Sequence, residues 1–233
     1  MIDFYYSPTP NGWKIAIMLA ETGLPHRTIL MRLTDGDQLT PEFRRINPNA
    51  KIPTIVDHDG ANGPEAIFES GAILLYLADK AGRFVPTDPM EWREALQWLF
   101  WQAGNQGPMA GQLSHFVNYA PADQCYSHKR YRGEFERNLA VLENRLKGRD
   151  YIMGDYSIVD MMAFPWVFIS KALGVLLDPY PNIIAWRQRM KDRPAVRTAI
   201  DLHKDAQFSG SASAENNSVL FNQSAEHLQA EPG

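Results

Sequence analysis

Segments typical of β-strands occur only within the first 80 residues of this 233-residue chain. Residues Ile2 to Tyr6 are short, aromatic and followed by a turn over residues 7–12, which predicts a strand. From Trp13 to Thr22 the apolar residues fall on one helical face, and Gly23 ends that helix. Residues Arg27 to Leu33 predict a second strand. A strand–helix–strand opening of about 30 residues is typical of a parallel pair.

The next segments complete a small α+β domain. Thr40-Pro41 predicts a short helix, because the pair supplies an N-cap and a proline at the first helical position. Residues 54–68 predict a hairpin, and Glu69-Ser70-Gly71 opens another helix. The expected order is βαβ–α–ββα, with domain bounds of 1–82.

After Gly82 no further strand is predicted, and residues 86–89 have the composition of a linker. Apolar residues recur every three or four positions from Lys129 to Lys147, and Ser157 to Asp160 resembles a capping box before an apolar helix. The helix over 92–102 is apolar on nearly every side, which predicts burial inside the domain or at a subunit contact. We therefore expect an all-helical domain over 90–208.

Residues 209–233 form a C-terminal tail of different composition. The tail begins with a linker-like run of Ser, Gly and Ala and contains one small apolar island around Leu220 and Phe221. Two alternatives stay open: a disordered tail, or an island that docks on the body or on a partner subunit.

The composition excludes several classes of function. Lys plus Arg number 23 and Asp plus Glu number 27, a net charge of −4, so broad nucleic-acid binding is not expected. The single cysteine, Cys125, allows neither an internal disulfide nor a CxxC redox pair. Cys125 with His128 makes a poor zinc site, so no metal is expected. With no apolar run of about 18 residues and no signal peptide, we expect a cytoplasmic protein without membrane segments.

The turn between the first strand and the first helix is the first candidate site. In open α/β sheets ligands bind beyond the carboxyl ends of the strands, and a helix N-terminus there favours anions, including a thiolate. Thr9 would add a hydroxyl and Asn11 an amide. The structural alternative is that Asn11 is only an N-cap and Thr9 only a turn residue.

Two further segments carry groups that suit a peptide-like ligand. Pro53 is a candidate cis-proline that would expose the backbone of Ile52 to an extended ligand, and Lys51 could pair with a carboxylate. The alternative is a surface lysine before a trans-proline. Glu69 suits an ammonium and Ser70 a carboxylate, unless both only cap the helix.

Taken together, these segments resemble the glutathione transferase superfamily of cytosolic enzymes. The resemblance covers roughly residues 1–200 and rests on four segments, most like those of the Nu class: Thr9-Pro10-Asn11-Gly12-Trp13-Lys14, Asn47-Pro48-Asn49-Ala50-Lys51-Ile52-Pro53, residues 68–77 and residues 97–102. It implies a thioredoxin-like N-terminal domain, an all-α C-terminal domain, a homodimer, and bound glutathione: one or two reduced molecules, or one oxidised molecule, per subunit.

The resemblance also assigns the binding residues. It places the glutathione sulfur near Thr9 and Asn11, and the glycine carboxylate near Lys51 with Gln38. The cysteinyl backbone falls to Ile52 beside Pro53, and the γ-glutamyl end to Glu69 and Ser70. Arg130 falls near a second glutathione. Other classes use a residue near the first strand for the sulfur, which makes Tyr5, Tyr6 and Ser7 rivals.

The implied activity is reduction of a small disulfide by the bound glutathione thiol, without a protein cysteine. The first alternative is a transferase or thioether lyase acting on small aromatic electrophiles or glutathione adducts. Aromatic rings of the helical domain could build an apolar wall for such a substrate, and the alternative for each ring is core or dimer packing: Trp98, Trp101, Phe116, Tyr119 and Trp166. The second alternative is a non-catalytic glutathione-binding module on the same fold.

Overall fold

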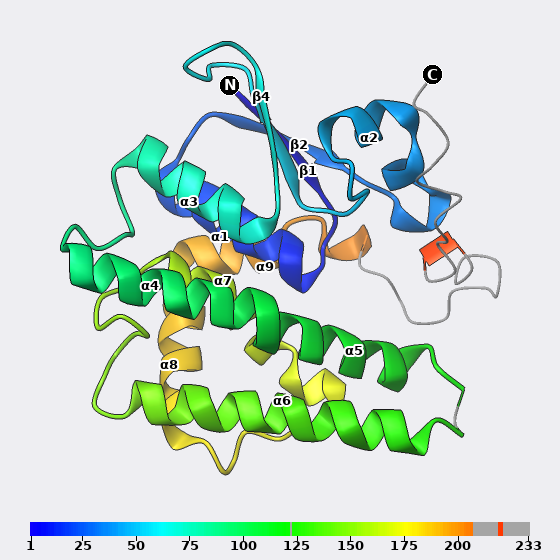
Figure 1. The fold of residues 1–233 in the computed structure, drawn as a ribbon, viewed down its shortest axis with the longest axis vertical. Coiled ribbons are helices and arrows are strands. Elements are labelled where there is room, and N and C mark those ends of the chain that lie inside the picture. The colour runs from blue at the N-terminus through cyan, green and yellow to red at the C-terminus, as the bar shows by residue number, and fades with distance from the viewer. Residues whose placement is uncertain (122, 207–218, 221–233) are drawn as a thin grey trace. The chain divides into compact units, whose positions relative to one another are not determined.

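The structure is a computed structural model, and it describes residues 1–121, 123–206 and 219–220 (Figure 1). Contacts divide the chain into two compact units: Met1–Leu77 together with the residues from Ala199 onward, and Ala78–Thr198. All four strands found in the described residues belong to the first unit, and the second unit is helical. This confirms the predicted fold class, an α+β domain followed by a helical one.

The first unit is built on a mixed four-stranded sheet of order β2-β1-β3-β4. Its strands are β1 (Ile2–Tyr6), β2 (His26–Leu30), β3 (Thr54–Asp57) and β4 (Glu65–Phe68). Strand β1 runs parallel to β2 and antiparallel to β3, which pairs with β4 as a hairpin. The predicted parallel pair and hairpin are therefore confirmed. The predicted extension of the second strand to Leu33 is wrong, because Leu33 begins a 3₁₀ turn.

Helices and short 3₁₀ turns complete this unit: α1 (Pro10–Thr22), η1 (Leu33–Asp35), η2 (Asp37–Leu39) and α2 (Pro41–Ile46). Two further helices, α3 (Ser70–Ala81) and α9 (Pro194–Asp201), cross its boundary. Helix α1 begins three residues before the predicted start at Trp13. The reason is that Thr9 caps the helix and Pro10, whose fixed φ suits a first turn, starts it.

Alternation along β1 places its side chains on opposite faces of the sheet. Phe4 and Tyr6 lie on one face and are fully buried. Tyr5 lies on the other face and packs edge-on against Phe43 of α2, with ring centroids 5.6 Å apart. Helix α1 approaches β1 so closely that a Cβ on Gly12 would lie 2.3 Å from the Ser7 carbonyl oxygen. Glycine is therefore required where α1 begins.

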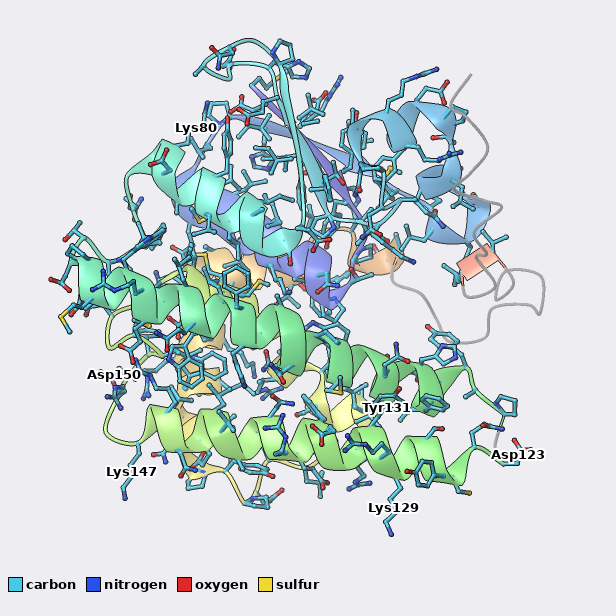
Figure 2. The ribbon with its side chains drawn as sticks, in the orientation of Figure 1. Lys80, Asp123, Lys129, Tyr131, Lys147 and Asp150 are labelled. Atoms are coloured by element: carbon cyan, nitrogen blue, oxygen red, sulfur yellow. The ribbon has the colours of Figure 1, made fainter. Side chains whose placement is uncertain are left out.

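The second unit contains α4 (Pro89–Trp101), a π-helical turn η3 (Gln102–Gln106), α5 (Gly107–Asn118), α6 (Cys125–Leu146), α7 (Ile158–Phe168), η4 (Ser170–Leu173) and α8 (Pro181–Asp192). Helices α5 and α6 run side by side (Figure 1). Between them Tyr131, labelled in Figure 2, stacks on Phe116 with centroids 5.4 Å apart. The predicted capping box is confirmed: the Ser157 side chain caps α7 and Asp160 bonds back to Ser157.

The helix predicted over 92–102 is not buried inside its unit. Phe100 is 73% exposed, and within α4 only Ala95 and Leu99 are buried. Burial inside the domain is therefore wrong for this helix, and a subunit contact stays a prediction. Nowhere in the described residues does a helix have both the length and the hydropathy to cross a membrane.

The C-terminal tail predicted over 209–233 lies outside the described residues, apart from positions 219 and 220. These two residues are helical. A Cβ on Gly36, in the turn between η1 and η2, would lie 3.7 Å from Cγ1 of Val219. Val219 therefore lies next to Gly36 within the first unit, as the docking alternative expects for this part of the island.

Candidate functional site

One cavity of about 200 Å³ lies wholly within the first unit. Three segments that are distant in sequence line it, at the start of α1, in the loop before β3 and at the start of α3: Asn11, Asn47, Asn49, Lys51, Ile52, Pro53, Glu69 and Ser70. The structure therefore brings together six of the predicted site residues.

The start of α1 is capped by Thr9. The Thr9 backbone is extended, with φ −124°, and its hydroxyl oxygen accepts a hydrogen bond from the Gly12 N–H at 3.3 Å. The alternative in which Asn11 is the cap and Thr9 only a turn residue is therefore wrong. Asn11 lies in the first helical turn and lines the cavity, whereas Thr9 lies two residues before it, outside the lining. The Thr9 hydroxyl accepts in the cap and retains its own proton to donate.

The loop before β3 is held in place by Asn47, which is 1% exposed. Its amide nitrogen donates to the Lys51 carbonyl at 2.6 Å and to the Thr54 hydroxyl at 2.8 Å, and its oxygen accepts from the Asn49 N–H at 2.9 Å. The Ile52–Pro53 peptide bond is cis, as predicted. The backbone of Ile52 is thus fixed beside the cavity that it lines.

The start of α3 presents Glu69 and Ser70 to the cavity. Glu69 has a φ of +69°, a left-handed conformation that is uncommon for a residue with a side chain. Its carbonyl accepts the Ile73 N–H at 2.9 Å, and its carboxylate accepts from the Asn49 amide at 3.4 Å. Strained backbone of this kind concentrates at binding and catalytic sites.

The lining of the cavity carries both signs of charge. Lys51 and the N-termini of α1 and α3 are positive, whereas Glu69 is negative. An extended ligand with carboxylates at both ends and an ammonium at one of them matches this pattern. Glutathione has these groups, so the residues present fit it.

Besides Thr9, two predicted site residues do not line the cavity, Gln38 and Arg130. Gln38 is 3% exposed, and its amide donates to the Leu33 carbonyl at 3.1 Å in the neighbouring 3₁₀ turn. Arg130 lies in the second unit on α6, where its guanidinium donates to Glu134 at 2.6 Å. The hydrogen bonds from Arg130 and Arg137 hold the pKa of the Glu134 carboxyl below its usual range.

The three rivals for the sulfur contact do not line the cavity either. Tyr6 is fully buried, and its hydroxyl donates to the Leu202 carbonyl at 3.1 Å. Burial raises the pKa of Tyr6, and it raises that of Tyr5, which packs on Phe43. Ser7 is 9% exposed, and its carbonyl accepts the Thr9 N–H. These contacts favour packing and turn roles for the three residues.

Four of the aromatic residues proposed as a substrate wall make ring contacts within the second unit, namely Trp98, Trp101, Phe116 and Tyr119. Trp98 packs edge-on against Trp101 with centroids 5.2 Å apart, and the Arg145 guanidinium lies over the Trp98 ring. Phe116 stacks on Tyr131, and Trp166 is 8% exposed. These contacts favour the packing alternative for these rings.

Sequence reasoning did not assign a role to three residues that shape the cavity. Asn47 and Asn49 stand in one of the segments that carry the resemblance, and their side-chain amides, which can donate and accept hydrogen bonds, could have indicated a role at the site. Lys14 also stands in such a segment, but a lysine on a helix gives no sign that its side chain is buried. It is 2% exposed, and its ammonium lies 3.1 Å from the Ser70 hydroxyl.

Comparisons with known proteins agree with this geometry. Residues 9–80 match the family model for the glutathione S-transferase N-terminal domain, and residues 115–194 match that for the C-terminal domain. Among curated proteins, the chain is 46% identical over 203 residues to the disulfide-bond oxidoreductase YfcG of Escherichia coli, covering 86% of this chain and 94% of the relative.

Solved structures give the same result. A glutathione transferase from Burkholderia graminis, with two glutathione molecules bound per subunit, has a TM-score of 0.82 and 44% identity over 87% of this chain and 88% of that one. One from Pseudomonas putida, with one glutathione disulfide per subunit, has a TM-score of 0.82 and 37% identity over 87% of this chain and 91% of the other.

Proposed function

Because the chain belongs to the glutathione S-transferase family, we propose that it is a glutathione-dependent disulfide-bond reductase that uses no cysteine of its own. The observation that carries the proposal is the cavity at the start of α1 and α3, whose lining suits glutathione. The name of YfcG supports disulfide-bond oxidoreduction, and the glutathione-bound relatives support glutathione as the cofactor. We place the chain near the Nu class, as a cytoplasmic homodimer.

Each residue of the cavity has a part in binding. Lys51 pairs with the glycine carboxylate, and the fixed backbone of Ile52 beside cis-Pro53 holds the cysteinyl residue in an extended form. Glu69 receives the γ-glutamyl ammonium and Ser70 its carboxylate. Gln38 and Arg130 lie outside the lining and have supporting roles, Gln38 next to Lys51 and Arg130 at a second glutathione.

The start of α1 activates the sulfur. Thr9 donates its hydroxyl proton to the sulfur, and the amide of Asn11 and the positive end of the α1 dipole add to this stabilisation. Stabilisation of about 2 kcal/mol lowers a thiol pKa by about 1.5 units. Bound glutathione supplies the thiolate for thiol–disulfide exchange, in which two glutathione thiols are oxidised to one disulfide as the substrate disulfide becomes two thiols.

The test compares three substrates with the purified protein and glutathione. We expect turnover of a small disulfide to exceed that of an aryl halide and of a glutathionyl aryl ketone. Faster reaction with either aromatic substrate would replace the reductase by a transferase or a thioether lyase. Binding of glutathione without turnover of any substrate would indicate a non-catalytic module.

Replacing Cys125 by Ala is expected to leave disulfide reduction unchanged, within about twofold. Cys125 is exposed at the start of α6 in the second unit and is the single cysteine of the chain. If the sulfur comes from glutathione, this thiol has no part in the exchange. The measurement is the initial rate of reduction at saturating glutathione. An inactive variant that is still folded would contradict the glutathione-only mechanism.

The proposed homodimer can be tested by measuring the mass of the protein in solution. Phe100 on α4 and Met90 at its start are each 73% exposed in the single chain, and exposed apolar side chains favour a partner surface. Sedimentation equilibrium should give twice the mass of 26.4 kDa. A single-chain mass at micromolar concentration would contradict the dimer and leave the proposed chemistry intact.

A further inference from the structure

Lys14 places a buried ammonium directly behind the wall of the cavity. It lies one turn into α1, its side chain is 2% exposed, and its nitrogen donates to the Ser70 hydroxyl oxygen at 3.1 Å. Ser70 is the first residue of α3 and lines the cavity. The lysine therefore joins the starts of two helices at the point where a ligand would meet Ser70.

This contact sets the direction of the Ser70 hydroxyl. In its charged form Lys14 has only protons to donate, so the Ser70 oxygen is then the acceptor in the bond to Lys14. The Ser70 proton is then directed away from the lysine, toward other acceptors around it. Because Ser70 lines the cavity, a ligand carboxylate there would find a donor already oriented.

The same contact gives a charge arrangement suited to an amino-acid end group. The Lys14 ammonium and the starts of α1 and α3 make one side of Ser70 positive. Glu69, the next residue, is a carboxylate in the lining and attracts Lys14. A carboxylate at Ser70 and an ammonium at Glu69 would each meet the opposite charge.

Burial makes this lysine costly for the fold. Burial lowers the pKa of the Lys14 ammonium to about 7, and Glu69 opposes that shift only in part. An apolar side chain of similar size would fill the same space without the cost of burying a charge. A costly polar group next to a ligand cavity is more simply explained by binding than by stability.

We propose that Lys14 is a positioning residue that acts through Ser70 to bind the α-carboxylate of the γ-glutamyl group of glutathione. This inference rests on the proposed function, because it assumes that glutathione occupies the cavity. It adds a residue outside the lining to the binding machinery, and it identifies the ligand group on which that residue acts.

The test is calorimetric titration of glutathione into the wild type and two Lys14 variants. We expect Lys14→Met to weaken binding about tenfold or more, since it removes both the donor and the charge. Lys14→Gln, whose amide still donates, should bind more tightly than Lys14→Met. Lys14→Met should also unfold at the same or a higher temperature than the wild type, because a buried charge has been removed.

A matched control and a double variant isolate the contact. Lys80→Met changes an exposed lysine near the end of α3, labelled in Figure 2, and should bind glutathione as the wild type does. If Lys14 acts through Ser70, adding Lys14→Met to Ser70→Ala should weaken binding by less than twofold beyond Ser70→Ala alone. Full additivity of the two effects would overturn the proposal.

A ligand that lacks the carboxylate completes the test. In γ-aminobutyryl-cysteinyl-glycine the α-carboxylate is missing and the ammonium is kept. The wild type and Lys14→Gln should bind it about equally, as should Lys14→Met if that variant folds. A Lys14 variant that lowers the affinity for both ligands by the same factor and also lowers the unfolding temperature would show a structural role only and overturn the proposal.

The outcomes separate this inference from the proposed function. If the wild type itself binds no glutathione, the proposed function fails. If every Lys14 variant binds glutathione as the wild type does, this inference alone fails.

Discussion

Replacing Thr9 by Ala is expected to reduce the rate of disulfide reduction by about 10- to 100-fold. In the proposed mechanism the Thr9 hydroxyl donates to the glutathione sulfur at the start of α1, and alanine has no donor there. The thiol pKa of bound glutathione should rise in the same variant, because the thiolate loses a hydrogen bond. The measurements are the steady-state rate at saturating glutathione and the ultraviolet absorbance of the thiolate as a function of pH.

The chain offers a matched control for this change. Thr40 caps α2 as Thr9 caps α1: its hydroxyl oxygen accepts the Phe43 N–H at 3.3 Å, and it does not line the cavity. Losing either cap should cost about 1 kcal/mol of stability. Thr40→Ala should therefore lose stability and keep its activity, and Thr9→Ser should keep both. Equal rates and equal thiol pKa values in Thr9→Ala and Thr40→Ala would exclude Thr9 from the chemistry.

Local sequence signals predicted the elements that frame the cavity. Turn residues and short aromatic or apolar runs identified β1 and the hairpin of β3 and β4. In the second unit, the Ser157 to Asp160 spacing identified the start of α7. These features depend on residues a few positions apart, so a single sequence contains them. Pro53 is of the same kind, since cis peptide bonds are almost confined to proline.

Features that depend on distant contacts were predicted less well. Lys14 stands among apolar residues of α1, and only the fold shows that its ammonium is covered and meets Ser70, 56 positions later. Gln38 was expected to bind the glycine carboxylate together with Lys51. Its amide donates to the Leu33 carbonyl in the preceding 3₁₀ turn, a contact that the sequence did not indicate, and its part in binding stays a prediction. The apolar pattern around Phe100 predicted burial, but it could not show whether Phe100 packs inside its own chain or against a second subunit.

The replacement of Asp160 by Ala is expected to lower the free energy of unfolding by about 3–5 kcal/mol at pH 7. Asp160 is fully buried and accepts hydrogen bonds from the Ile152 N–H at 2.9 Å, the Ser157 N–H at 3.0 Å and the Trp186 indole at 2.8 Å. Alanine leaves these buried donors without that acceptor. The Ile152 turn, the start of α7 and helix α8 would all lose a shared contact.

The pH dependence of this loss follows from the carboxyl group. Burial raises the pKa of Asp160 to about 6, whereas a carboxyl in an unfolded chain titrates near about 4. Between these values the folded protein holds a proton that the unfolded chain has released, so the contribution of Asp160 is complete below about pH 4 and falls as the pH rises to about 6. Urea unfolding followed by circular dichroism should therefore show a larger deficit for Asp160→Ala at pH 4.5 than at pH 7. Asp155→Ala is the control, because it changes an exposed acidic residue between Ile152 and the start of α7. If both variants unfold at the same urea concentration, Asp160 does not stabilise the second unit as its contacts indicate.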